Sequence, residues 1–278
     1  MTLSIGFSPC PNDTFIFHGL VKGLVDDSPA FTEPVLTDVE TLNEWALAAR
    51  LDVSKLSFHA LGHVLDDYVL LRAGGALGRG CGPLLVSRAD RADMPIAEMT
   101  VAIPGRLTTA AMLLRLFAPS CRRFVAMRFD GIMGAIADGQ VDGGVIIHES
   151  RFTYRRHGLV CRQDLGSWWE EMTGYPIPLG GIVARRSLGR KKILRIEEAI
   201  RASVRLAFQY PETCRDYIKK HAQELDDQVV HDHIHLYVNK FTEDLGAEGV
   251  KAVAEFLRLG EDSGLFKKKG HNIFLDKL

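Results

Sequence analysis

Several features that would place this chain in a familiar class are missing from its sequence. The N-terminus, MTLSIGFSPCPND, has neither the basic region nor the apolar region of a secretory signal. Nowhere does the chain approach the roughly 18 to 20 consecutive apolar residues that a membrane-spanning helix needs. We therefore expect a protein that is not exported and has no membrane partner.

Paired cysteines and an excess of charge are missing as well. The five cysteines are an odd, scattered set with no CxxC pair, which argues against a disulfide framework or a zinc site and favours the reducing cytoplasm. With 34 basic and 35 acidic residues the formal net charge is -1, so the charge gives no reason to expect nucleic acid. We expect a cytoplasmic protein without a nucleic-acid partner.

A nucleotide-binding loop is the third absence. The glycine-dense stretch GGALGRGCGP, residues 74–83, contains neither a GxGxxG that opens a helix nor a GxxxxGK[ST] loop. Its glycines predict flexible backbone ahead of the next strand instead. Arg79 within the stretch is a candidate anion ligand.

The sequence does contain an alternation of short β-rich runs and helical patterns. The β-rich runs are residues 3–7, 35–39, 55–58, 69–71, 84–88, 101–103, 124–129 and 145–147. The helical patterns are residues 14–23, 40–50, 109–117, 131–138, 193–210, 226–240 and 248–260. This rhythm predicts an α/β fold with parallel sheets that helices cover on both faces.

Two similar segments divide the chain, GPLLVSR at 82–88 and GGIVARR at 180–186. Each has glycine, then an apolar run, then arginine, and the residues between them carry their own strands and helices. We interpret the pair as a two-stranded hinge, with a discontinuous lobe one at 1–96 and 181–278 and a continuous lobe two at 97–180. Chance resemblance of two buried strands is the alternative. We expect the last dozen residues, which include KKKG, to be a frayed tail.

Polar side chains follow the first predicted strand. SPCPNDTFIF begins directly after it, at the edge where α/β sheets place ligands, so Ser8 and Asn12 are candidates to point into a site. Two prolines fix a rigid turn, and Asn12 or Asp13 can cap a helix that starts at Thr14. For Asp13 we favour this capping role over a functional one.

KLSFHALGH, residues 55–63, brings Lys55 and Ser57 to the end of another strand. Alternation puts both side chains on the same face of the strand. Lys55 is a candidate anchor for a carboxylate, although a lone lysine is more often only solvated.

AIPGRLTTAA, residues 102–111, joins a strand to a strongly apolar helix. Thr108 or Thr109 can be the N-cap of this helix. Such a helix start offers backbone N–H groups and a partial positive charge, which bind a carboxylate or a phosphate. Capping alone is the other explanation for the two threonines.

VIIHES, residues 145–150, runs from a buried strand straight into polar groups. Of these, only His148 titrates near neutral pH, which makes it the natural general base; a buried structural histidine is the alternative. We expect Glu149 to face the opposite side and to make a structural contact. Ser150 lacks the GxSxG context of a hydrolase nucleophile.

Other histidines are spaced four residues apart without further metal ligands. His59 and His63 lack the glutamate of HExxH, and His231 and His235 in HDHIH lack an acidic third ligand. We expect the HDHIH segment to be a solvated helix. The tryptophans of WWEEMTGYP, residues 168–176, either wall an aromatic ligand or pack the junction of the lobes.

Taken in order, FSPCPNDTFIF, DVETLN, KLS, RAGGALGRGCGPL, VAIPGRLTTA, IIHESRFTY and DLGSWWEE strongly resemble the 1,4-dihydroxy-6-naphthoate synthases of the futalosine route to menaquinone. The resemblance runs from about residue 3 to residue 240. It implies a two-lobed α/β fold like that of type II periplasmic solute-binding proteins, which agrees with the two-strand hinge.

The resemblance also implies an activity and a site. The activity is that of a lyase that releases a sugar-derived fragment from cyclic dehypoxanthinyl futalosine, an aromatic carboxylate, without a cofactor. The base falls on His148. Substrate contacts fall on Lys55, Leu56, Ser57, Thr109 and Ala110. The alternatives are a solute-binding or sensor protein with the same fold and the chorismate dehydratase of the same pathway.

Overall fold

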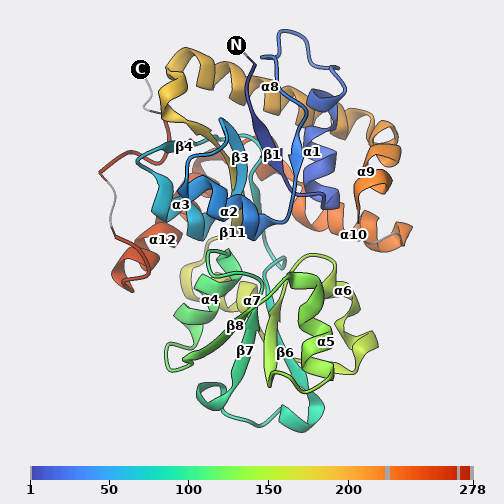
Figure 1. The fold of residues 1–278 in the computed structure, drawn as a ribbon, viewed down its shortest axis with the longest axis vertical. Coiled ribbons are helices and arrows are strands. Elements are labelled where there is room, and N and C mark those ends of the chain that lie inside the picture. Colours follow the sequence, from blue (N-terminus) through green and yellow to red (C-terminus); the bar gives the residue numbers. More distant parts are fainter. Residues whose placement is uncertain (1, 223–225, 268–269, 276–278) are drawn as a thin grey trace.

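The computed structural model describes residues 2–222, 226–267 and 270–275, and it folds into two lobes, each built on one sheet (Figure 1). The first sheet has the strand order β2-β1-β3-β11-β4, with β5 paired to β11. Its strands are β1 (Ile5–Phe7), β2 (Val35–Leu36), β3 (Val53–Ser57), β4 (Tyr68–Leu70), β5 (Ala76–Gly78) and β11 (Ile177–Arg185). The second sheet has the order β10-β6-β9-β7-β8. Its strands are β6 (Leu84–Arg88), β7 (Thr100–Ile103), β8 (Arg123–Ala126), β9 (Gly143–Ile146) and β10 (Leu159–Asp164).

Both sheets are mixed, whereas the sequence predicted parallel ones. β1 is parallel to β2 and β3, and β7 is parallel to β8 and β9, as expected. β11 is antiparallel to β3, and β6 is antiparallel to β9. The path of the chain explains this difference. β6 and β11 begin at the boundary between the lobes, just after the chain has crossed it, whereas their neighbours β9 and β3 end at that boundary, so each pair is antiparallel.

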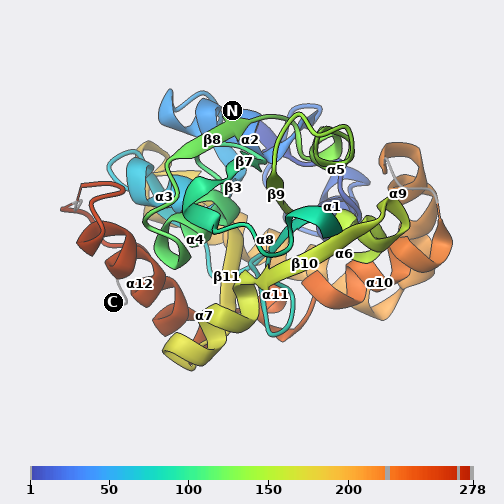
Figure 2. The same cartoon turned by 90° about the horizontal axis from the view of Figure 1, so that it is seen from below.

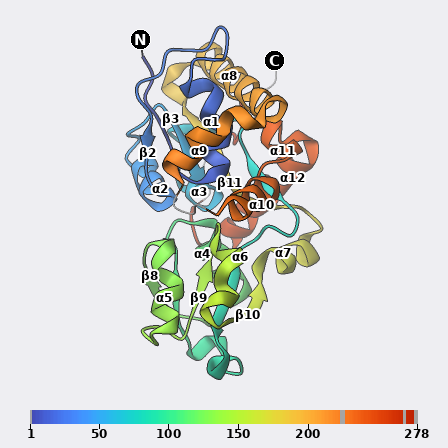
Figure 3. The same ribbon diagram turned by 90° about the vertical axis from the view of Figure 1, so that its right-hand side faces the viewer.

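Helices cover both faces of the first sheet. The helices of this lobe are α1 (Pro11–Val21), α2 (Val39–Leu47), α3 (Phe58–Val64), α8 (Arg190–Gln209), α9 (Arg215–His221), α10 (Asp227–Tyr237), α11 (Lys240–Glu243) and α12 (Gly246–Asp262). Alternate residues of β11 divide the core: Ile182 packs with α1 and α8 on one face, and Val183 with α3 and α12 on the other. Figure 3 shows α1 and α8 together on one side of this lobe.

The second lobe carries α4 (Thr109–Phe117), α5 (Ile132–Ala137), α6 (Ser150–Thr153) and α7 (Leu165–Thr173). Seen from below in Figure 2, β10 runs across this lobe beside α6 and leads to α7. Within the described residues, no helix is both long and apolar enough to cross a bilayer.

The chain crosses between the lobes after β5 and again before β11. Strand 84–88, which we expected in lobe one, pairs in the second sheet, so the first crossing lies before residue 84 and not near residue 96. Arg151 holds this crossing, because its guanidinium donates to the carbonyl oxygens of Gly80, at 2.9 Å, and Gly82, and pairs with Asp164 at 2.7 Å. Arg151 therefore has a structural task.

The C-terminal segment is less frayed than its composition suggested. The backbone N–H of Leu70 donates to the carbonyl oxygen of Ile273 at 2.9 Å, which ties the segment to the edge of the first sheet. The expected tail is thus wrong for residues 270–275. Residues 268–269 and 276–278, on which the same expectation falls, lie outside the described residues.

The chain is packed so closely at the first crossing that one added methyl group should lower the stability of the protein. A Cβ at Gly82 would collide with the backbone of Gly166, so Gly82→Ala should lower the free energy of unfolding by about 1–3 kcal/mol. Gly131, with φ at -82° and nothing within 4 Å of an added Cβ, is the matched control. Gly131→Ala should raise stability by about 0.4–1 kcal/mol in the same urea titration. Equal midpoints for the two variants would contradict this packing.

Candidate functional site between the lobes

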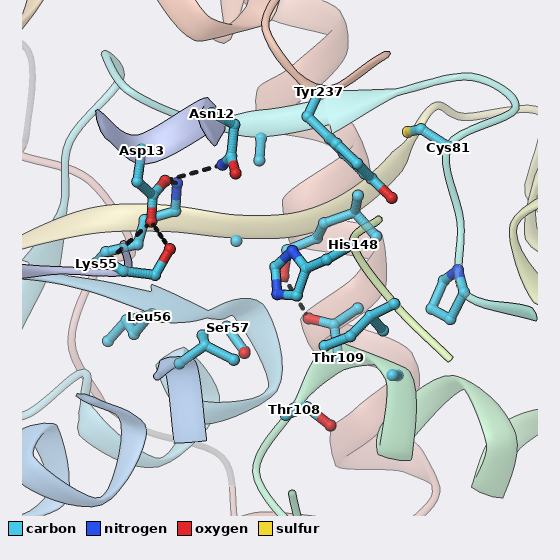
Figure 4. A pocket seen from close by; sticks show the side chains of 18 residues that line it. Asn12, Asp13, Lys55, Leu56, Ser57, Cys81, Thr108, Thr109, His148 and Tyr237 are labelled. Atoms are coloured by element: carbon cyan, nitrogen blue, oxygen red, sulfur yellow. Dashed lines mark hydrogen bonds and ion pairs between the residues drawn. The ribbon is translucent and has the colours of Figure 1, made fainter. Parts of the chain in front are cut away.

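A pocket lies between the two lobes and gathers the predicted base and the predicted substrate contacts (Figure 4). The predicted residues that line it are Ser8, Asn12, Lys55, Leu56, Ser57, Thr109, Ala110 and His148. The residues that line it without having been predicted are Asp13, Val39, Ala76, Cys81, Pro83, Thr108, Ile147, Leu179, Gly180 and Tyr237. Segments far apart in the chain thus meet at one place.

The first turn of α1 forms one wall of the pocket. We expected this helix to start at Thr14, but it starts at Pro11, which occupies the N1 position. Proline fits there because its fixed φ suits a helix and its missing N–H would have no partner anyway. Asn12 and Asp13 therefore lie inside the helix and are buried. Asp13 does not cap the helix, so that expectation was wrong.

Asp13 instead forms a buried ion pair with Lys55. Lys55 Nζ and Asp13 Oδ1 are 2.5 Å apart, and their side chains are 5% and 3% exposed. Asp13 also accepts hydrogen bonds from Ser8 Oγ at 2.7 Å and from Asn12 Nδ2 at 2.9 Å. The charge of Lys55 is thus balanced inside the pocket. Ser8, Asn12 and Lys55 were predicted as site residues, and all three contact the Asp13 carboxylate, which was not.

Ser57 ends β3 with one hydrogen-bonding group still available. Its backbone N–H donates to Asn43 Oδ1 at 2.9 Å, and its Oγ accepts from Asn43 Nδ2 at 3.1 Å. The hydroxyl hydrogen of Ser57 can therefore be donated to a ligand. Asn43 on α2 fixes the orientation of this hydroxyl.

The start of α4 forms the opposite wall. Thr108 is its N-cap, because the Thr108 hydroxyl accepts from the backbone N–H of Ala111 at 3.2 Å. The Thr109 hydroxyl joins the lobes: it donates to the carbonyl oxygen of Leu179 at 2.6 Å and accepts from the backbone N–H of Phe58 at 3.1 Å. The first N–H groups of a helix have no partner within it, so those of Thr109 and Ala110 can serve a bound anion.

His148 stands just beyond β9 in an unusual backbone conformation. Its φ is 55°, in the left-handed region that few residues other than glycine adopt. Its ring meets Phe129 edge-on, with centroids 5.1 Å apart, and lies nearly parallel to the ring of His233 at 5.9 Å. Strained backbone of this kind concentrates at functional sites, so the conformation supports a functional role.

The electrostatic surroundings keep the His148 imidazole neutral near pH 7. Burial lowers its pKa below the usual 6.5, and the charge of Lys55 acts in the same direction. The carboxylates of Glu149 and Asp13 act against burial and raise the pKa. A neutral imidazole has a free lone pair and can accept a proton.

Two residues beside the pocket come from α10, the helix that contains the HDHIH segment, which we interpreted as solvated. Tyr237 ends α10 and lines the pocket, and burial raises the pKa of its hydroxyl, which stays protonated. His233 is fully buried and bonds Asn12. Only the two other histidines of HDHIH, His231 and His235, are the exposed pair that the spacing suggested. No cluster of three or more metal-ligating side chains occurs among the described residues.

Other candidate residues lie outside the pocket. Arg79 is exposed and pairs with Glu248 at 3.1 Å. Trp169 is fully buried against Phe256, and Trp168 packs against the ring of Phe117. The tryptophans therefore pack the protein and do not line the pocket.

The chain is similar to known proteins over nearly its whole length. The profile of a family described as menaquinone biosynthesis matches residues 3–262. The chain is 52% identical over 98% of its length to the 1,4-dihydroxy-6-naphthoate synthase of Thermus thermophilus, of which 99% is covered. It is 47% identical over 97% of its length to the protein of the same name from Streptomyces coelicolor, of which 96% is covered.

Solved structures share the fold. A crystal structure of a protein from Archaeoglobus fulgidus has a TM-score of 0.89 at 32% identity and covers 95% of this chain and 98% of its own. The periplasmic aliphatic sulphonate binding protein of Escherichia coli has a TM-score of 0.65 at 12% identity, with 100% of this chain and 94% of its own covered. The predicted two-lobed, periplasmic-binding-protein-like α/β fold is confirmed.

The Asp13–Lys55 pair can be tested by its effect on stability. Asp13→Asn leaves the buried Lys55 charge without a counter-charge, so the free energy of unfolding should fall by about 3–5 kcal/mol in urea titration. The matched control is Asp130→Asn, which removes an exposed pair with Arg128 and should change stability by less than about 1 kcal/mol. A similar effect of both substitutions would show that the pair is not the buried contact described above.

Proposed function

The chain belongs to the menaquinone-biosynthesis family of 1,4-dihydroxy-6-naphthoate synthases, and we propose that it cleaves cyclic dehypoxanthinyl futalosine with His148 as the general base. It is therefore an enzyme of the class that its sequence resembles. The observation that supports the role of His148 is its position: a neutral imidazole lines the same pocket as Lys55, Leu56, Ser57, Thr109 and Ala110, the substrate contacts that the family resemblance implies.

The start of α4 suits the carboxylate of the substrate. The backbone N–H groups of Thr109 and Ala110 stand at the positive end of a nine-residue helix, where an anion needs no lysine or arginine. Apolar side chains of Val39, Ile147 and Leu179 line the same pocket and can cover an aromatic ring. An aromatic carboxylate with a sugar-derived part fits both surfaces, because its carboxylate can bind at the start of α4 and its ring can pack against the apolar side chains.

Lobe one supplies hydrogen-bond donors for the oxygen-rich part of the substrate. Ser57 has its hydroxyl hydrogen available, and the ammonium group of Lys55 has three hydrogens, of which Asp13 accepts one. These donors face the pocket from the lobe opposite to His148. Closure of the lobes around the substrate would exclude water and bring the base against the reacting group.

The chemistry requires only one proton acceptor to begin. His148 takes a proton from the substrate, the electron pair that this releases drives cleavage of a carbon–carbon bond, and the new aromatic ring supplies driving force. A positioned base of this kind contributes roughly 10²- to 10⁴-fold in rate. Independence from metals and cofactors, and a cytoplasmic location, stay predictions from the sequence.

The two rival functions make different predictions in one assay. A sensor or solute-binding protein would bind cyclic dehypoxanthinyl futalosine without converting it, and a chorismate dehydratase would convert chorismate instead. Solute-binding proteins share only the fold with this chain, at 12% identity for the sulphonate-binding protein, whereas the synthases share 47% and 52% of its residues. Mass spectrometry of the reaction products separates the three.

We predict that His148→Asn abolishes most turnover and spares binding. Asparagine tolerates left-handed backbone, so this substitution removes the base without the added strain of alanine at φ 55°. The rate constant kcat should fall by about 10²- to 10⁴-fold, while the dissociation constant of the substrate stays within about threefold. His231→Asn, on an exposed helix face, is the control and should keep wild-type turnover. Turnover within threefold of wild type in His148→Asn would exclude the base.

The pH dependence of the reaction gives a second test. The neutral imidazole is the active form, so kcat/KM should fall as the pH drops through the pKa of His148. Because burial lowers that pKa, the midpoint of the fall should lie below pH 6.5. A midpoint at or above pH 6.5 would contradict the environment described for His148.

A further inference from the structure

Tyr237 lines the pocket, and the proposed reaction does not use it. It is the last residue of α10 and is only 6% exposed, and Figure 4 shows its hydroxyl pointing into the pocket. Among the residues that the structure describes, this hydroxyl has no hydrogen-bond partner. Because buried hydroxyls are normally hydrogen-bonded, an unpaired one in a pocket indicates a donor that is available to a ligand.

The other hydroxyls of the pocket already make hydrogen bonds. The hydroxyl hydrogens of Ser8, Thr108 and Thr109 are donated to oxygens of the protein at 2.7, 2.9 and 2.6 Å. The hydrogen of Ser57 is available, but the oxygen of that hydroxyl accepts from Asn43. Within the described part of the chain, Tyr237 thus has the pocket hydroxyl that neither donates nor accepts.

The surroundings of the Tyr237 hydroxyl keep it protonated and in place. Burial raises its pKa, so the group stays neutral and donates a hydrogen bond without giving up its proton. The ring of His233 lies against the Tyr237 ring, with centroids 4.7 Å apart and planes tilted by 56°, and His233 Nε2 in turn lies 2.9 Å from Asn12 Oδ1. A donor that is fixed in advance stabilises developing charge without reorganisation during the reaction.

The chemistry of the proposed reaction provides an acceptor for this donor. When the carbon–carbon bond breaks, its electron pair enters the ring that becomes aromatic, and an oxygen on that ring carries the charge. In 1,4-dihydroxy-6-naphthoate, after which the related synthases are named, both hydroxyl oxygens are on one ring and the carboxylate is on the other. A carboxylate bound at the start of α4 therefore directs the oxygen-bearing ring away from α4. Figure 4 shows Tyr237 on the other side of the His148 ring from Thr108 and Thr109.

We propose that Tyr237 is a further catalytic residue, whose hydroxyl donates a hydrogen bond to the ring oxygen of the substrate on which negative charge develops. His148 accepts the proton, the carbon–carbon bond breaks, and its electron pair comes to rest on that oxygen. The proton on His148 then returns to the products, so no further reactant is consumed, and Tyr237 keeps its own proton throughout. This inference rests on the proposed function.

Tyr237→Phe tests the role of the hydroxyl, because it removes one oxygen and keeps the ring. The rate constant kcat should fall by about 10²- to 10³-fold, with KM within about threefold, because the hydrogen bond strengthens only as the charge develops. The midpoint of urea unfolding should stay unchanged, because the hydroxyl has no partner in the described protein to lose. Tyr68→Phe is the matched control: its buried hydroxyl lies outside the pocket and donates to the carbonyl oxygen of Leu51 at 2.6 Å. This control should lower the urea midpoint and keep wild-type kcat.

Several outcomes would overturn the inference while the wild-type enzyme still converts cyclic dehypoxanthinyl futalosine. Wild-type kcat in Tyr237→Phe, or a rise in KM alone, would show that the hydroxyl does not stabilise the developing charge. A fall in the urea midpoint as large as that of Tyr68→Phe would show that the hydroxyl serves a partner within the protein. If the wild-type enzyme gives no conversion, the proposed function fails instead.

A binding measurement tests the hydrogen bond without turnover. The probes are 5-hydroxy-2-naphthoate and 8-hydroxy-2-naphthoate, each of which has the carboxylate and one of the two ring hydroxyls of the product. Absorbance follows the ionisation of that hydroxyl in the bound probe. For at least one probe, ionisation should need a pH about 1–2 units higher in Tyr237→Phe than in the wild type, because the variant cannot donate to the ring oxyanion. Equal ionisation midpoints in the two proteins for both probes would overturn the inference.

Discussion

The buried ion pair between Asp13 and Lys55 is the contact on which the site depends. It joins the first turn of α1 to β3 at 2.5 Å, and the same carboxylate holds Ser8 and Asn12. An unpaired charge at this depth would be strongly destabilising, so each partner requires the other. Through Asn12 the network continues to His233, and from there to the lobe that carries His148. One carboxylate thus organises one wall of the pocket and leaves it with little net charge.

The remaining constraint is that the functional groups are divided between two lobes. The proposed anion site at the start of α4 and the proposed base at the end of β9 both belong to the second sheet's lobe, whereas the hydrogen-bond donors Lys55 and Ser57 belong to the first. Thr109 bridges the lobes by bonding Leu179 and Phe58. The pocket between the lobes also contains a neutral imidazole, which is the group that the proposed catalysis requires.

Sequence reasoning found the parts of this site that stand at strand ends or helix starts, because those positions follow from local pattern. Lys55, Ser57, Thr109 and His148 are of this kind. It missed Asp13 and His233, because their tasks depend on partners 42 and 221 residues away. The fold shows the same division: the boundaries of β6 and α4 matched the prediction. β5 and β10, which are short or polar strands with partners far away in the sequence, were not recognised.

The most direct test of the central claim is a crystal structure of the His148→Asn variant with cyclic dehypoxanthinyl futalosine bound. The account predicts that the substrate carboxylate meets the backbone N–H groups of Thr109 and Ala110. It also predicts that the atom that loses its proton lies within about 3.5 Å of the side chain at position 148. A substrate bound elsewhere, or bound in this pocket with its reacting atom turned away from position 148, would contradict it.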